Sequence, residues 1–336
     1  MSDTHNEKEL KFNTRDPAPE TKPPTRAHAK LIDASVLIYG EVATKKDAAF
    51  IARELVQVSL PHSNPGNIPV WTRTNGNMTL AIQAGADIAT GKSYGYPYGT
   101  IPRLLLFWMT TEALRNSRKD NSRRLDLGHN LKEFMLELGL NPDNGSKGAK
   151  RSDARRLNDQ MNRFFNSVIS FQGGSEQDGR MVTARRNMLV AEDIVFWWDA
   201  NNPGQTTLWG SYIDLSERFY EAITAAPVPV DVRALHALKA SALALDLYAW
   251  LSYEAYRASK SGKPRFETWQ QLQGHCGGNY AVIGDFRRKA KGAIHKIKAV
   301  YPGLKLGKKQ GGIEVLPESL TALQPCQIVN GTCKTL

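Results

Sequence analysis

The sequence predicts an α+β protein, mainly helical, built from two winged-helix domains in tandem. Two observations predict this class. Along the 336 residues, three helical patterns followed by strand-like alternation occur twice, and this order is typical of a winged helix. The second occurrence also ends in a short hairpin with a basic, glycine-rich tip. The two copies share no evident sequence identity, so the repeat is one of architecture only.

The chain divides into five predicted parts. Its first residues are polar and contain Pro17, Pro19, Pro23 and Pro24, and such a composition cannot bury a core. The predicted parts are a disordered tail (1–27), a helical segment (28–66), a first winged-helix domain (67–228), a second winged-helix domain (229–317) and a C-terminal tail (318–336).

The elements up to the end of the first domain follow from periodicity and turn residues. Pro102 opens an apolar run and predicts the start of a buried helix, and Gly139 predicts the end of the helix that begins near His129. In chain order we expect two short helices within 28–60, a hairpin over 70–82, the buried helix from 101, a strand at 124–127, helices over 129–138 and 150–169, and strand-like runs at 168–171, 180–185, 189–198 and 206–212.

The second domain shows the same order more clearly. Its apolar patterns predict one long helix over 232–258, a short helix over 266–275 and a third helix over 279–300. Apolar residues then alternate at Leu304 and Leu306, and again at Ile313 and Val315, across the tip 307–312. This pattern predicts a hairpin, which is the wing.

Positive charge is concentrated in this second domain. The whole chain carries a net charge of +11. Between Tyr280 and Gly311 there are nine lysines and arginines, and Asp285 is the only acid. A basic patch this dense favours a polyanion as partner, and nucleic acid is the commonest one.

The helix predicted over 279–300 separates its apolar and basic residues. At 100° per residue, one narrow stripe is apolar and the opposite side is basic. The stripe contains Val282, Phe286, Ala290, Ala293, Ile297 and Val300, and the basic side contains Arg287, Arg288, Lys291, His295 and Lys298. We expect the basic side to enter a DNA major groove and the wing lysines Lys305, Lys308 and Lys309 to contact the flanking backbone. The alternative is an ordinary solvated face.

The corresponding helix of the first domain is less regular. Its candidate DNA-binding residues are Lys150, Arg151 and Arg155, but Asp153 and Asp159 interrupt them. The basic residues also fall into two groups around the helix. Contact with the DNA backbone, pairing with a protein and reading of bases therefore all stay open for this domain.

No enzymatic motif is complete, and we expect neither catalysis nor a cofactor or metal. The phosphate-loop-like Gly91-Lys92-Ser93 has a misplaced first glycine, and Pro97 rejects the helix that should follow. No two histidines are one residue apart, as a DNA-nicking metal site needs, and no carboxylates cluster for two metals. The pair His275-Cys276 is interpreted as a helix end. The cysteines show no paired spacing, and no apolar run suggests a signal peptide or a membrane span, so we expect a cytoplasmic protein.

Four blocks of sequence resemble the RepA-type plasmid replication initiators. They are YPYGTIPRLLL at 96–106, LALDLYAWLSY at 243–253, ETWQQLQGH at 267–275 and FRRKAKGAIHKIKAVYPGL at 286–304. The resemblance spans about 90–320. It implies a bacterial protein that binds repeated sequences, or iterons, in double-stranded plasmid origin DNA and recruits the host initiator and replicative helicase. It further implies that Arg287 to Lys298 read the iteron, and that the first domain contacts backbone or mediates monomer–dimer self-association.

Two functions are compatible with these features. The first is a replication initiator without catalysis of its own, and the second is a winged-helix transcriptional repressor, acting on its own gene for example. Direct repeats beside an AT-rich tract would favour initiation. An inverted repeat alone would favour repression, because operator symmetry follows the symmetry of a protein dimer.

Overall fold

The computed structural model describes residues 25–143, 152–177, 180–198, 203–276, 278 and 280–323. Its helices are α1 (Arg26–Gly40), α2 (Arg53–Gln57), α3 (Ile101–Lys119), α4 (Leu131–Glu137), α5 (Asp153–Phe165), α6 (Glu217–Thr224), α7 (Val232–Leu238), α8 (Ala242–Ser261), α9 (Trp269–Cys276) and α10 (Ile283–Ala299). Its strands are β1 (Ala48–Ala52), β2 (Trp71–Asn75), β3 (Met78–Gln83), β4 (Arg124–Gly128), β5 (Val168–Gln177), β6 (Arg180–Leu189), β7 (Ala191–Val195), β8 (Ser211–Leu215), β9 (Pro227–Asp231), β10 (Arg265–Thr268) and β11 (Gly312–Val315).

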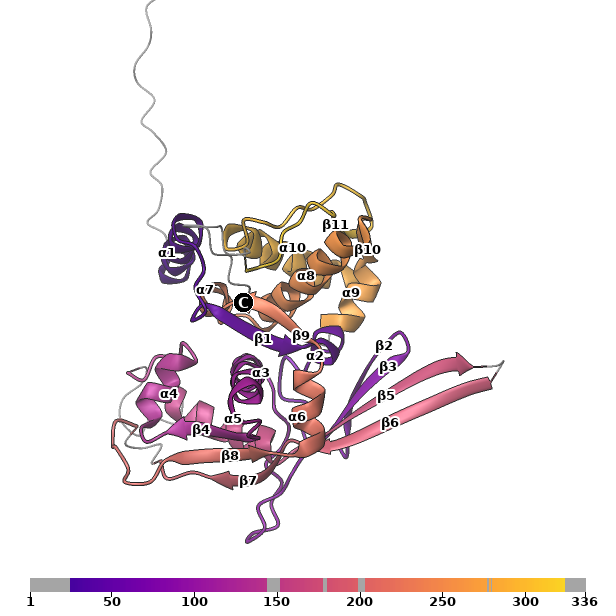
Figure 1. Cartoon of the computed structure of the whole chain (residues 1–336). Coiled ribbons are helices and arrows are strands. Elements are labelled where there is room, and N and C mark those ends of the chain that lie inside the picture. Colours follow the sequence, from indigo (N-terminus) through magenta and orange to yellow (C-terminus); the bar gives the residue numbers. More distant parts are fainter. Residues whose placement is uncertain are drawn as a thin grey trace, which may run out of the picture.

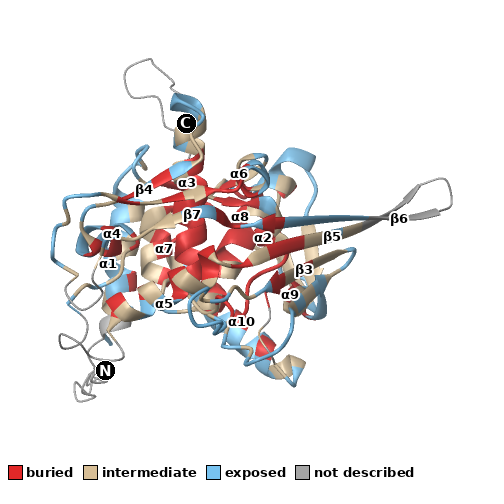
Figure 2. Ribbon diagram, turned by 90° about the horizontal axis from the view of Figure 1, so that it is seen from below, coloured by how far each residue is buried: buried red, intermediate tan, exposed pale blue. Residues whose placement is uncertain are grey.

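The strands form four small antiparallel sheets, in the orders β1-β9, β10-β11, β2-β3-β5-β6 and β4-β8-β7. In Figure 1 the pair β1-β9 runs between two groups of elements. Helices α1 and α7 to α10, with β10 and β11, lie above it, and α3 to α5 with the sheet β4-β8-β7 lie below it. Strands β5 and β6 extend away from both groups (Figures 1 and 2).

Helix α3 is the central element of the lower group. Every residue from Ile101 to Thr111 is buried, because the helix packs against β1, β4, α5 and α6. Pro102 lies in its first turn, where the missing N–H has no intrahelical partner to lose. Figure 2 shows buried residues concentrated in this central part of the molecule.

Several predicted elements are confirmed. The hairpin over 70–82 is the pair β2-β3, with Trp71 opposite Ile82, and the helices expected near 101, 129 and 150 are α3, α4 and α5. Gly139 follows α4 with a positive φ of 70°, as its predicted role at a helix end requires.

Three helix predictions are wrong, wholly or in part. The helix expected over 266–275 begins only at Trp269, because Arg265–Thr268 form strand β10. The helix expected over 232–258 is two helices, α7 and α8, because the Ser241 side chain accepts a hydrogen bond from the Ala244 N–H and starts α8 anew. Residues 48–52, expected to be helical, form strand β1. There, pairing with β9 from Ala48–Asp231 to Ala52–Pro227 overrides the local helix propensity.

A buried ion pair joins the lower group to the upper one. Arg103 of α3 is 2% exposed, and its Nε and Nη2 donate to the two carboxylate oxygens of Asp246 in α8 at 2.6 and 2.8 Å. The other guanidinium hydrogen bonds go to the Pro61, Gly99 and Leu60 carbonyls, at 3.0, 2.6 and 2.7 Å. The His62 Nε2 lies 2.8 Å from the second carboxylate oxygen. The charges are therefore both paired and hydrogen-bonded, which a buried pair requires.

Burial and charge shift the titration of this cluster. Burial alone would raise the pKa of the Asp246 carboxyl, but the Arg103 guanidinium and the His62 hydrogen bond outweigh burial and hold that pKa well below its usual range. Burial lowers the pKa of His62, although its hydrogen bond to Asp246 opposes the shift. Burial also lowers the pKa of His236 on α7.

Replacing Asp246 with Asn should destabilise the protein strongly. The change leaves the buried Arg103 charge without its partner, which typically costs about 3–5 kcal/mol in the free energy of unfolding. The exposed pair Arg123–Glu192 provides the control, since Glu192→Gln should cost about 1 kcal/mol or less. Urea unfolding followed by circular dichroism measures both, and equal small losses would contradict the role given to Asp246.

Stability should also fall as the pH is lowered from 7 to 5. The pKa values of His62 and His236 are lowered by folding, so the unfolded chain binds protons below about pH 6.5 that the folded chain does not yet bind. The lowered pKa of Asp246 adds nothing in this window, because that carboxyl stays ionised in both states. Urea titrations at several pH values should show this fall, and His62→Gln should make it shallower; an unchanged slope would contradict the assignment.

Candidate nucleic-acid interface

Helix α10 separates a buried apolar face from an exposed basic face, as its sequence predicts. Its buried residues are Phe286, Ala290, Ala293, Ile294 and Ile297, and they pack the helix against α8 and α9. Ile294 is an addition to the predicted stripe. Val282, which was predicted to belong to that stripe, is 58% exposed because it precedes the first turn as the N-cap residue.

All predicted basic residues of this helix are exposed. They are Arg287, Arg288, Lys291, His295 and Lys298, and Lys289 and Lys296 are exposed beside them. We call the five predicted residues the basic ridge. Two of its members have a neighbour that holds them: Arg288 pairs with Asp285 at 3.0 Å, and the Lys291 Nζ lies 6.0 Å from the centre of the Trp269 ring. The Arg288–Asp285 pair is fully at the surface, where ion pairs contribute little to stability.

The segment predicted to form the wing follows α10 and pairs with β10, the strand before α9. β11 pairs with β10, from Arg265–Val315 to Thr268–Gly312, and Leu306 forms an isolated bridge to Val315. Lys305, Lys308 and Lys309 are all exposed, and the Lys309 Nζ lies 4.3 Å from the Phe266 ring centre. The structure thus places the three predicted wing lysines on the hairpin that follows α10.

Of the DNA-binding residues predicted for the first domain, the structure describes only one. Lys150 and Arg151 lie outside the described residues. Arg155 is half-buried on α5. Arg156 is exposed but pairs with Asp153 at 3.0 Å. This helix therefore presents a more mixed surface than α10.

Helices α5 and α10 border the same turn between α7 and α8. A polar hollow of about 380 Å³ is lined by Arg156 and Arg163 of α5 together with Ala240. A groove of about 490 Å³ is lined by His295 and Lys296 of α10, again together with Ala240. The charged residues of the two helices thus flank one turn, a neighbourhood that periodicity could not reveal.

Lys239, within this turn, was not among the predicted residues. Burial lowers the pKa of its ammonium, and the nearby Lys30 of α1 lowers it further. Asp153 opposes this shift, and burial is its main cause. Nothing in the sequence indicated this position, because Lys239 lies within the run 232–258 that was predicted to be one continuous helix.

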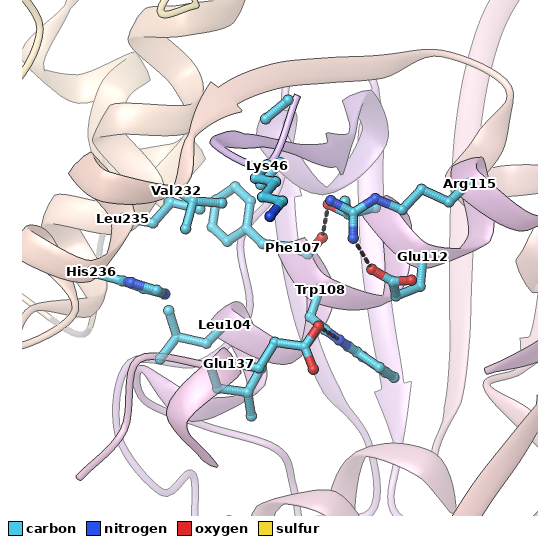
Figure 3. A pocket seen from close by; sticks show the side chains of 14 residues that line it. Lys46, Leu104, Phe107, Trp108, Glu112, Arg115, Glu137, Val232, Leu235 and His236 are labelled. Atoms are coloured by element: carbon cyan, nitrogen blue, oxygen red, sulfur yellow. Dashed lines mark hydrogen bonds and ion pairs between the residues drawn. The ribbon is translucent and has the colours of Figure 1, made fainter. Parts of the chain in front are cut away.

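A separate cavity of about 190 Å³ lies between α3 and α7 (Figure 3). Leu104, Phe107 and Leu235 line it, and the Trp108 Nε1 donates to Glu137 at 2.9 Å along its wall. Its described lining comes from α3, α4, α7 and the chain around β1. The cavity is therefore a gap between the two groups of elements, and no residue of the basic ridge lines it.

The pair His275-Cys276 is located at the end of α9, as predicted. Burial raises the pKa of the Cys276 thiol well above its ordinary value, and the thiol donates to the Leu272 carbonyl at 3.3 Å. A thiol held protonated in this way is a poor nucleophile. Across the described part of the chain, no three His, Cys, Asp or Glu side chains are grouped so that they could hold a metal ion.

Comparison with known proteins identifies the family. A family model described as plasmid encoded RepA protein matches residues 96–271, more than half of the chain. The chain belongs to this RepA family. The resemblance expected from the sequence is confirmed, and family membership supports a role in initiating plasmid replication. The match ends within α9 and does not include α10. For this RepA family member, the role of the basic ridge is therefore argued from the charge and geometry of α10 alone.

Other comparisons add little to the family match. No curated protein sequence matches the chain. Among solved structures, the crystal structure of domains 2 and 3 of RctB is similar over 78% of this chain and 94% of that one, with 9% identity and a TM-score of 0.44. So low a score supports no assignment. In the described residues of the RepA family member, no helix is both long and apolar enough to cross a membrane.

The two α10 faces should respond differently to substitution. Ala293→Asp buries an unpaired carboxylate against α8 and α9 and should lower the free energy of unfolding by several kcal/mol, as isolated buried charges do. Lys298→Ala, on the exposed side, should change it by about 0.5 kcal/mol or less. Urea unfolding of both variants tests the orientation of the helix, and comparable losses would contradict it.

Proposed function

We propose that the chain initiates plasmid replication by binding repeated sequences in double-stranded origin DNA through α10, without catalysing a reaction itself. One observation carries this proposal: α10 buries its apolar face and exposes the basic ridge, and the segment that follows it along the chain carries three exposed lysines. A helix of this kind fits the major groove, where arginine and lysine can bind guanine acceptors. Membership of the RepA family supplies the biological setting.

In this proposal the C-terminal unit is a winged helix. Its support is the order α8, β10, α9, α10, followed by the hairpin of Leu306 and β11. In proteins of that design the second helix of the helix–turn–helix enters the major groove with its N-terminal residues toward the bases. Arg287, Arg288 and Lys291 lie in that half of α10, so they are the proposed base-reading residues.

The first unit is proposed to be a second winged helix. The order α3, β4, α4, α5 supports this, together with the hairpin β7-β8, which pairs with β4 through β8. Because α5 mixes acids with its arginines, its proposed role is contact with the flanking backbone or pairing of two copies of the chain. Its place beside the same turn as α10 favours the backbone contact.

Recruitment of the host initiator and replicative helicase follows DNA binding in this proposal. Trp197 and Trp209, in and beside the connection between β7 and β8, are 51% and 62% exposed. Exposed aromatic side chains of this kind are common at protein interfaces. They are the surface that we assign to a protein partner.

Footprinting on the plasmid's origin region tests the function directly. Protection of successive direct repeats beside an AT-rich tract would support initiation. Protection of a single inverted repeat upstream of the chain's own gene would instead assign it to repression, which would use the same ridge. Absence of any protected sequence would contradict both.

Removing the base-reading residues together should abolish sequence discrimination. With Arg287, Arg288 and Lys291 all changed to Ala, origin DNA should bind no better than a scrambled duplex, because each bidentate contact contributes about 1–3 kcal/mol of discrimination. The control is the change of Arg115, Arg118 and Lys119, at the end of α3, to Ala, which removes equal charge. Fluorescence anisotropy measures the affinity of both variants for origin and scrambled DNA. If the variant of Arg287, Arg288 and Lys291 still prefers origin DNA, the proposal is overturned.

The wing should contribute affinity without specificity. If the protein neutralises about six phosphates, the slope of log affinity against log salt should be about −5. Lys308→Ala and Lys309→Ala should each weaken origin and scrambled DNA alike and reduce that slope by about one. A selective loss on origin DNA would show instead that the wing reads bases.

A further inference from the structure

Residues 57–62, which we call the strap, connect the lower group of elements to the helix–turn–helix. The strap begins at Gln57, the last residue of α2, and is mostly buried, with Val58 0%, Ser59 3% and Leu60 2% exposed. Its polar backbone groups are therefore expected to have protein partners. Those partners come from three different places in the fold.

The first attachment is to the end of α9. The Ser59 N–H donates to the His275 carbonyl at 3.1 Å. The His275 Nδ1 lies 3.0 Å from the Gln57 carbonyl oxygen and 2.7 Å from the Asn75 Nδ2. The same Asn75 amide also donates to the Gln57 carbonyl, at 3.0 Å. The last turn of α9 is thus bound both to the strap and to the β2-β3 hairpin.

The second attachment is to Gly278, which lies between α9 and α10 in the chain. The His62 ring packs against Gly278, where a Cβ would lie only 3.1 Å from the His62 Nδ1. The other ring nitrogen, Nε2, is fixed by Asp246 of α8 at 2.8 Å. The ring therefore lies between Gly278 and Asp246 of α8, which approach each other closely. Gly278 is the residue that permits this approach.

The third attachment is to α3. The Arg103 guanidinium binds the Pro61 and Leu60 carbonyls at 3.0 and 2.7 Å. The same guanidinium holds Asp246. The strap, α3 and α8 therefore share one buried polar network, and His62 is the member of it that reaches the turn before α10.

We infer that His62 is a positioning residue for DNA recognition: through Gly278 and Asp246 it fixes the turn from which α10 projects toward DNA. The inference rests on the proposed function of α10. Base reading requires side chains held within about half an ångström of their productive geometry. Contacts between flexible lysines and phosphates tolerate larger displacements, because they depend mainly on charge. Loosening the turn should therefore reduce specificity while leaving general affinity for DNA intact.

The test uses the full chain and compares His62→Ala, Gly278→Ala and the double variant. His62→Ala should lower the ratio of origin to scrambled-duplex affinity by about tenfold, equivalent to about 1.4 kcal/mol. Gly278→Ala should have a similar effect, because its methyl group displaces the ring. In the His62→Ala background the same methyl group meets no ring, so the double variant should be no worse than His62→Ala alone. His129→Ala, which changes an exposed histidine elsewhere, is the control and should leave the ratio unchanged.

Two readouts separate positioning from a general loss of folding. Affinity for scrambled DNA and the salt slope should stay at the parent values, whereas partial unfolding would weaken both DNAs alike. Amide exchange over 280–286, measured without DNA, should be faster in His62→Ala than in His129→Ala. Unchanged exchange, or equal loss of affinity on both DNAs, would overturn the inference. A parent chain that does not discriminate origin DNA would overturn the proposed function itself, whatever the exchange shows.

Discussion

The bidentate pair of Arg103 and Asp246 is the interaction on which the arrangement of this protein depends. It joins α3, at the centre of the lower group, to α8, at the centre of the upper one, with both carboxylate oxygens engaged. Buried ions are costly unless every polar atom finds a partner, and here the Leu60, Pro61 and Gly99 carbonyls accept the remaining hydrogen bonds. The same carboxylate also binds His62, whose ring packs against Gly278 between α9 and α10.

The proposed DNA surface follows from this arrangement. α10 can present its basic ridge only if its apolar face is covered, and α8 and α9 provide that cover. Ala240, in the turn before α8, lines one hollow with arginines of α5 and another with His295 and Lys296 of α10, so basic residues from both halves of the chain border this turn. A surface of this kind would contact more of a duplex than either helix could contact alone.

The sequence predicted those features that depend on interactions between residues close together in the chain. The two faces of α10 follow from a period of 3.6 residues, and the β2-β3 hairpin follows from alternation around Asn75-Gly76. The break before Ser241 was missed because the run around it contains no glycine or proline, and a serine cap leaves only a weak signal. Strand β1 was missed because its partner β9 lies far along the chain. The division of the chain into domains and the DNA contacts of individual residues stay predictions.

The buried network could not be foreseen for a related reason. His62 and Asp246 are 184 residues apart, and Arg103 and Asp246 are 143 apart, so no spacing rule connects them. A lone histidine in a loop, an arginine in an apolar helix and an aspartate in another apolar helix each look like isolated exceptions. Only the fold shows that Asp246 binds both of the other side chains through hydrogen bonds.

Methylation protection on origin DNA tests the central claim, that α10 reads bases in the major groove, most directly. Guanine N7 atoms line that groove and are acceptors for arginine. The account predicts guanines shielded at the same position in each successive repeat, and loss of that shielding when Arg287 alone is changed to Ala. Repeats bound by the protein with every guanine N7 still reactive would contradict it.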